Sequence, residues 1–120
     1  MRIHHVSIPI PPGGQDAGRT FYARVIGLSE IPIPQALEPL GVVWFAVGDG
    51  ETEVHLLPES PPDPAAERHF ALLVDDCVAL RRRLEAAGYA TWDGVPIPGR
   101  TRCFARDPFG NAIEVWSLTP

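Results

Sequence analysis

The sequence contains no lysine, since all ten of its basic residues are arginine. Without a lysine amine there is no group for a Schiff base, which excludes lysine-bound pyridoxal chemistry. Cysteine is also scarce, and Cys77 and Cys103 have neither metal-finger nor redox-motif spacing. We therefore expect both cysteines to be reduced, buried thiols.

Long apolar runs and clusters of positive charge are absent as well. No apolar run approaches the roughly 18 residues of a membrane span, and the segment MRIHHVSIPI lacks a leader pattern, so we expect a cytoplasmic protein without membrane contact. The formal net charge is −5 and the arginines are scattered, which leaves no basic stripe for nucleic acid. Small molecules are the expected partners.

What the sequence does contain is a repeat, because two halves of the chain follow one pattern. The repeat makes His55 the counterpart of a carboxylate in the second half and pairs two histidines that begin strands. The paired positions are Val43–Ala46 with Arg102–Ala105 and His55 with Glu114, at a shift of 59, and His5 with His69, at a shift of 64.

Each half is expected to contain one helix after its first strand. Asp16 is the expected cap of a helix that runs to about Ile26 and ends at Gly27, and Asp75 or Asp76 is the expected cap of a helix that ends at Gly88. The expected core-facing residues of the two helices are Phe21, Tyr22 and Val25, and Val78, Leu80, Leu84 and Ala87.

Further strands follow each helix, so the order is strand, helix, strands, twice. They are expected at Val42–Val47, Glu53–Leu57, Arg102–Ala105 and Ala112–Leu118. We expect a single α+β domain over residues 1–120, built of modules 1–58 and 67–120. The segment PESPPDPAAE is the expected Pro-rich, extended connector between the modules.

Four polar side chains share one face of the expected strands. Side chains alternate between the faces of a strand, so parity decides the face that each residue occupies. Apolar residues such as Ile8 and Leu72 fall on the parity that packs against the helices. The polar residues of the opposite parity are His5, His55, His69 and Glu114.

A single histidine in a strand is usually a satisfied or half-exposed side chain. Three histidines and a carboxylate at repeat-equivalent positions with the same facing form a pattern that chance seldom arranges. Neutral imidazole and carboxylate are ligands of Zn, Fe, Mn, Ni and Co, and such a set leaves positions for substrate. We expect these four side chains to converge on one divalent transition metal.

Two further polar residues, His4 and Glu53, lie close to these positions in the sequence. His4 falls on the helix-facing parity, so a structural or edge position is expected. Glu53 shares the parity of His55 and is an alternative ligand, although the repeat pairs it with Ala112, which favours a solvated carboxylate. The choice between Glu53 and His55 stays open at this point.

Four motifs extend over nearly the whole chain: HHVSIPI, FYARVIGL, RHFALLVDD and RDPFGNAIEVW. With them the sequence resembles the vicinal oxygen chelate superfamily, which includes glyoxalase I, extradiol dioxygenases, fosfomycin-resistance proteins, methylmalonyl-CoA epimerase and bleomycin-resistance proteins. The resemblance implies tandem βαβββ modules that form a cupped, mixed, glyoxalase-like sheet around a divalent metal, often within a homodimer. It places His5, His69 and Glu114 on ligand positions, and His55 where many members have a second-strand ligand.

The expected chemistry depends on a metal that binds two adjacent oxygens of a small substrate. The metal would act as a Lewis acid and stabilise an enolate or alkoxide in isomerase or lyase chemistry, or support a dioxygenase reaction if it is Fe(II). Glu114 would remain a ligand or serve as general base. Trp44, Arg100 and Arg102 are candidates for holding a planar or anionic substrate, with packing and surface solvation as their alternative roles.

One departure from the family pattern concerns His55, because glyoxalase I members commonly have glutamate or glutamine there. The chain also lacks long insertions that would define a glutathione site. The competing function is a metal-free protein of bleomycin-resistance type, which sequesters a small molecule or antibiotic. The polar set counts against that reading, since an apolar cleft has no need of it. A structural or partner-binding protein with a vestigial site is the third alternative.

Overall fold

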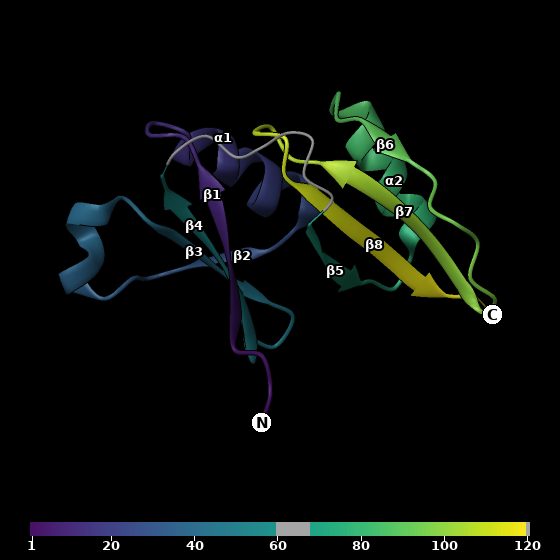
Figure 1. Ribbon diagram of the computed structural model, residues 1–120, viewed down its shortest axis with the longest axis horizontal. Coiled ribbons are helices and arrows are strands. Elements are labelled where there is room, and N and C mark those ends of the chain that lie inside the picture. The colour runs from purple at the N-terminus through teal and green to yellow at the C-terminus, as the bar shows by residue number, and fades with distance from the viewer. Residues whose placement is uncertain (60–67, 120) are drawn as a thin grey trace. The chain divides into compact units, whose positions relative to one another are not determined.

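The computed structural model describes residues 1–59 and 68–119. The chain forms two compact units, Met1–Pro62 and Asp63–Pro120. Each unit has a four-stranded mixed sheet with a helix after its first strand (Figure 1). The predicted α+β class and the repeated strand, helix, strands order are confirmed. The predicted connector PESPPDPAAE lies, from residue 60 on, outside the described residues.

The N-terminal unit has the sheet order β1-β4-β3-β2, with β1 parallel to β4 and the other pairs antiparallel. A parallel pair requires a crossover connection, which begins here with the helical segment after β1. The elements of this unit are β1 (His5–Ile10), α1 (Gln15–Arg19), η1 (Thr20–Ile26), β2 (Ser29–Ile31), η2 (Gln35–Leu40), β3 (Val43–Val47) and β4 (Thr52–Pro58).

The C-terminal unit repeats this arrangement with the sheet order β5-β8-β7-β6. Its first strand again pairs in parallel with its last, and the other pairs are antiparallel. The elements of this unit are β5 (His69–Leu73), α2 (Cys77–Ala86), β6 (Thr91–Trp92), β7 (Arg100–Arg106) and β8 (Ala112–Leu118).

The core of each unit lies on one face of its sheet, as the alternation of the sequence predicts. Each fully buried aliphatic side chain contributes about 1.5–3 kcal/mol through burial. The buried strand residues of the predicted parity are Ile8, Ile10, Val54, Leu56, Leu72, Ile113 and Val115.

The first helix begins earlier than predicted, because Gly14 and not Asp16 is its N-cap. The backbone N–H of Gly18 donates to the carbonyl of Gly14 at 2.9 Å, while the Asp16 carboxylate accepts from Arg19 at 3.0 Å. Asp16 therefore lies in the first turn, where its negative charge still interacts favourably with the positive end of the helix dipole.

From Thr20 to Ile26 the helix widens into a π-helix, η1. The wider turn brings Ile26 into the core beside Phe21 and Tyr22, whereas Val25, the predicted core residue, is only half-buried. Gly27 ends the helix with φ at 98°, a left-handed conformation that glycine adopts without strain, as predicted.

The second helix, α2, is capped by Asp76, whose carboxylate accepts from the Ala79 backbone N–H at 2.9 Å. Its buried residues are Cys77, Leu80 and Leu84. The prediction that Val78 and Ala87 face the core is wrong, because both residues are exposed. Leu80 and Leu84 are buried as predicted, and Cys77, the first residue after the Asp76 cap, is buried with them. Over residues 1–59 and 68–119, no helix has the length and hydropathy needed to cross a membrane.

The strand ladders test the repeat directly. Ser7 lies opposite His55 and Ala71 lies opposite Glu114, so the predicted equivalence of His55 and Glu114 is confirmed. The shift of 59 is wrong for the preceding strand, since Trp44 pairs with His55 whereas Phe104 pairs with Glu114. The hairpin of the first unit is one residue longer, which makes Phe104 the counterpart of Trp44.

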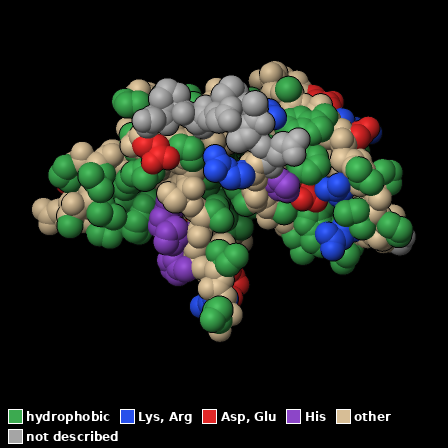
Figure 2. All heavy atoms as spheres, in the orientation of Figure 1, with side chains coloured by type: hydrophobic (Ala, Val, Ile, Leu, Met, Phe, Trp, Pro, Cys, Tyr) green, Lys and Arg blue, Asp and Glu red, His purple; other side chains and the backbone are tan. Residues whose placement is uncertain are grey.

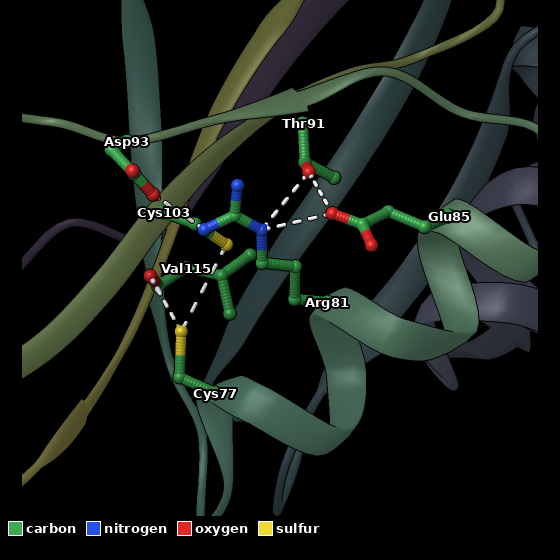
Figure 3. A network of polar contacts seen from close by, with 7 residues as sticks. All are labelled: Cys77, Arg81, Glu85, Thr91, Asp93, Cys103 and Val115. Atoms are coloured by element: carbon green, nitrogen blue, oxygen red, sulfur yellow. Dashed lines mark hydrogen bonds and ion pairs between the residues drawn. The ribbon is translucent and has the colours of Figure 1, made fainter.

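Arg81 on α2 ties this helix to the segment after it (Figure 3). Its guanidinium donates to Glu85 and Thr91, both at 3.0 Å, and to Asp93 at 2.5 Å. The ion pairs with Asp93 and Glu85 raise the pKa of Arg81 above its ordinary value. The network holds β6 and Asp93 at the C-terminal end of the helix.

The two cysteines lie in the core of the C-terminal unit, reduced and buried as predicted. Their sulfur atoms are 3.9 Å apart, and the Cys77 thiol donates to the carbonyl of Val115 at 3.3 Å. Burial raises the pKa of Cys103 to about 12. At neutral pH this thiol is protonated, and thiols react as thiolates.

We expect both thiols of the native protein to resist a disulfide-exchange reagent at pH 8, because burial blocks access and suppresses the thiolate of Cys103. In guanidinium chloride both should react at once. The release of the coloured thiol from the reagent measures the reaction. Rapid modification of either thiol in the native protein would contradict the packing described here.

Candidate functional site

Three aromatic rings form a stack on the helix-free face of the N-terminal sheet. The rings of Trp44 and His55 are parallel within 2° with centroids 4.0 Å apart, and His5 stacks on the other side of His55, also at 4.0 Å. Strand pairing explains the stack, since Trp44 lies opposite His55 and His5 belongs to the adjacent strand β1. Figure 2 shows histidine side chains, in purple, at the surface of this unit.

His55 is the most buried of these histidines and is held by Glu53. Its Nε2 atom lies 2.8 Å from Oε1 of Glu53, and the two side chains are 9% and 16% exposed. Burial lowers the pKa of His55, and the hydrogen bond to Glu53 opposes that shift. The same hydrogen bond lowers the pKa of Glu53. At neutral pH His55 is therefore a neutral imidazole, the form that binds metals.

The two alternatives for the first-half ligand are thus neighbours on one face. Glu53 lies opposite His5 in the ladder and contacts His55 directly. It is not the solvated carboxylate that the sequence favours. In the C-terminal unit the corresponding place opposite His69 is taken by Ala112. His4 precedes β1 and is exposed, with its Nδ1 atom 3.0 Å from that of His5.

The C-terminal unit brings His69 and Glu114 together. Nε2 of His69 lies 3.3 Å from Oε2 of Glu114, and the Glu114 side chain is 12% exposed. Glu114 interrupts the apolar run of β8 because its parity directs it away from the helix and toward His69. The two residues were predicted from the sequence to share a face, and the structure places them in contact.

Arg102 holds the other oxygen of the Glu114 carboxylate. Its NH1 group donates to Oε1 of Glu114 at 2.8 Å, and its Nε and NH2 groups donate to the Val95 carbonyl at 3.2 and 3.0 Å. All three nitrogens of this guanidinium are therefore in use. Arg100, two residues earlier, stacks its guanidinium over Trp116 at 4.2 Å and is exposed. Substrate binding by Arg100, Arg102 and Trp44 stays a prediction.

Beside His69 lies a hollow of about 480 Å³, here called the β6–β7 hollow. Sequence reasoning missed most of its lining, including Phe104 and Arg106. The signal that would have found these two residues is the parity of Arg102, which they share on the same strand. The hollow is lined chiefly by His69, Trp92, Arg102, Phe104, Arg106 and Ala112.

The donor atoms of the C-terminal unit fit a divalent metal. Two ligands at about 2.1 Å from one ion, at the angles of tetrahedral or octahedral geometry, lie about 3.0–3.4 Å apart. The 3.3 Å between His69 and Glu114 falls in this range. Among the described residues, no group of three or more His, Cys, Asp or Glu side chains forms a complete metal site. Convergence of the two pairs, His5 with His55 and His69 with Glu114, stays a prediction.

Comparison with known proteins identifies the family. Residues 2–115 match the family model of the Glyoxalase/Bleomycin resistance protein/Dioxygenase superfamily, and the chain belongs to this superfamily. Its resemblance to the vicinal oxygen chelate proteins is thereby confirmed. A search of curated proteins finds no match.

Solved structures agree with this assignment. A putative glyoxalase family protein from Bacillus anthracis is 33% identical, with 99% of this chain and 96% of that chain covered and a TM-score of 0.90. Two structures below 25% identity share the fold. TnmS3, an antibiotic binding protein from Streptomyces sp. CB03234, is 22% identical over 99% and 97% of the two chains, with a TM-score of 0.78. Lactoylglutathione lyase from Agrobacterium tumefaciens is 24% identical over 97% and 92%, with a TM-score of 0.72.

We expect Glu53→Gln to lower the pKa of His55 further. In the unsubstituted protein the Glu53 carboxylate stabilises the protonated imidazole and so opposes the lowering of the pKa by burial. Histidine ring resonances followed by NMR through a pH titration of chelator-treated protein measure this shift. Glu51→Gln is the matched control, since Glu51 is an exposed carboxylate of the same unit that pairs with Arg2. An unchanged or higher pKa of His55 in Glu53→Gln would contradict the hydrogen bond.

Proposed function

We propose that this protein is a divalent-metal-dependent enzyme that acts on a small molecule with two adjacent oxygen atoms. The observation that carries the proposal is the contact of His69 with Glu114, whose donor atoms are separated as two ligands of one ion would be. The equivalent positions of the N-terminal unit hold His5 and His55, which again face one way. Family membership supports the proposal, because the superfamily includes lyases and dioxygenases.

The proposed ligands are His5, His55, His69 and Glu114, with Glu53 as the alternative to His55. Zn, Fe, Mn, Ni or Co would suit this set of imidazoles and carboxylate. When bound, such an ion polarises substrate oxygens as a Lewis acid. The low pKa of His55 favours binding, since no proton must be displaced from its ring at neutral pH.

Glu114 is the proposed catalytic residue. Its Oε2 atom faces His69, while Arg102 keeps Oε1 in place through the 2.8 Å ion pair. Held in this way, the carboxylate can take a proton from a substrate carbon or hydroxyl and return it to a neighbouring atom. Such a transfer serves isomerase and lyase reactions, and an oxygenase would use the same residue to deprotonate a hydroxyl group. The enzyme would act in the cytoplasm as a homodimer, in keeping with the family.

A second candidate function is the sequestering of a small molecule without metal. It is favoured by the β6–β7 hollow, where Trp92 and Phe104 stack with ring centroids 5.5 Å apart. The similarity of fold to TnmS3, described as an antibiotic binding protein, agrees with this candidate. Metal binding separates the two candidate functions.

We expect protein purified without chelator to contain a divalent transition metal. Removing the metal with EDTA should lower the thermal unfolding midpoint, because an ion that binds only the folded state stabilises it by about 2.7 kcal/mol at a concentration of 100 Kd. Elemental analysis and thermal unfolding with added Zn, Mn, Fe, Co or Ni measure both effects. Trace metal with no stabilisation by any of the five would favour the sequestering function.

Glu114→Gln should retain the fold and lower the metal affinity by more than about a hundredfold. Replacing a residue that only supports a metal ligand lowers the affinity about 10–100-fold, and loss of a ligand itself should cost more. The amide keeps the shape of the side chain but loses the charge that binds the ion. Calorimetric titration with the preferred metal measures the loss, and far-UV circular dichroism checks the fold. Arg102→Gln should show a smaller loss, because Arg102 only orients the carboxylate.

Glu53→Gln is the matched comparison in the N-terminal unit. If His55 is the ligand, Glu53 is the residue behind it, and this variant should keep the metal with a loss of affinity of about 10–100-fold, smaller than the loss in Glu114→Gln. If Glu53→Gln removes the metal and Glu114→Gln retains it, Glu53 replaces His55 as the first-half ligand and the proposed role of Glu114 is lost.

A further inference from the structure

Strand β7 directs two arginines and a phenylalanine into the β6–β7 hollow. Arg102, Phe104 and Arg106 occupy alternate positions of the strand and therefore share one face. Trp92 on β6 lies directly opposite Phe104, and the two rings stack within 13° of parallel. The hollow thus has an aromatic wall with a guanidinium at each end.

The two guanidinium groups differ in their partners. Arg102 is ion-paired with Glu114 and donates twice to the Val95 carbonyl. Arg106 donates NH1 to the carbonyl of Gly110 at 2.9 Å and lies over the Trp92 ring at 5.0 Å. Across residues 1–59 and 68–119, Arg106 has no carboxylate within ion-pair distance. No carboxylate in the described part of the chain neutralises its positive charge.

The acidic residue that lines the hollow does not supply the missing charge. Asp93 is ion-paired with Arg81 on α2 (Figure 3). The side chain across the ladder from Arg106 is the small Ala112, which leaves space in front of the guanidinium. A half-buried arginine with space before it, and with no counter-ion among the described residues, favours an anionic ligand, since guanidinium binds carboxylates with two parallel hydrogen bonds.

The turn after β7 holds Arg106 in this position. Asp107 accepts backbone hydrogen bonds from Phe109 at 2.9 Å and from Asn111 at 2.8 Å, which closes the DPFGN turn. That turn presents the Gly110 carbonyl to Arg106. One guanidinium nitrogen is thereby anchored, and the remaining N–H groups, which donate to none of the described residues, can bind a ligand.

We infer that the β6–β7 hollow binds the carboxylate of a small organic acid with a planar, aromatic body. The carboxylate pairs with Arg106, and the ring lies along Trp92 and Phe104. This inference rests on the proposed function in one respect, because His69 lines the same hollow and would face the reactive end of the substrate. Glu114 lies two residues along β8 from Ala112, about 7 Å away, which a single aromatic ring spans.

Calorimetric titration of EDTA-treated protein with 2-naphthoate, 2-naphthamide and acetate tests the inference. The naphthoate should bind at least about tenfold more tightly than the neutral amide, since a charge-assisted hydrogen bond is stronger than a neutral one by that order. It should also bind more tightly than acetate, which lacks the ring. Equal affinity for naphthoate and naphthamide would overturn the role of charge, and equal affinity for naphthoate and acetate would overturn the aromatic body.

Variants of Arg106 assign the effect to this residue. Arg106→Gln should weaken naphthoate binding by at least about tenfold and leave naphthamide binding unchanged. Arg82→Gln is the control, because Arg82 is an exposed arginine of α2 and the change in net charge is the same. Arg106→Lys keeps the charge and should retain the preference for naphthoate, even if the packing on Trp92 changes. Undiminished naphthoate binding in Arg106→Gln would overturn the inference.

A metal titration distinguishes failure of this inference from failure of the proposed function. Arg106→Gln should bind divalent metal as the unsubstituted protein does, since Arg106 contacts none of the proposed ligands. If metal binds and naphthoate does not, the inference is wrong and the metal-dependent function stands. If naphthoate binds through Arg106 and no metal binds, the protein is a module that binds aromatic acids and the proposed enzyme is wrong.

Discussion

The parallel pairing of the first and last strand in each unit controls which side chains reach the helix-free face of the sheet. In β1 and β4, and again in β5 and β8, apolar residues at alternate positions lie opposite one another across the ladder and are buried together in the core. A slip of one residue would bury His55 or Glu114 against a helix and expose an aliphatic side chain. The polar positions therefore follow from the burial of the apolar ones.

Both carboxylates on that face contact an imidazole, but only Glu114 is also ion-paired with an arginine. Glu53 contacts the imidazole of His55, and burial keeps that imidazole neutral at neutral pH. Glu114 lies between His69 and Arg102, with one oxygen toward each. The repeat thus supplies equivalent backbone positions, while the neighbouring side chains give the two halves different charges.

The C-terminal unit also builds a second chemical environment beside the first. The hydrogen bonds of Arg81 hold the segment that carries Trp92 and Asp93, and Arg102 holds the same segment through the Val95 carbonyl. Gly94 lies between these contacts, where an added Cβ would come within 2.5 Å of Arg102 and 2.7 Å of Phe104. These contacts hold Trp92, and with it the aromatic wall, in place beside β7.

The sequence by itself determined the class of fold, the repeat and the face of each candidate ligand, because strand alternation is a local property of the chain. It also located the ends of both helices, at Gly27 and Gly88, which need only local backbone freedom. The tertiary structure alone decided the π-helical turn that buries Ile26 and the extra residue that makes Phe104 the counterpart of Trp44. It also decided the partners of Glu53, Glu114 and Arg106, because contacts across a sheet depend on register and on loop length, which no local pattern encodes.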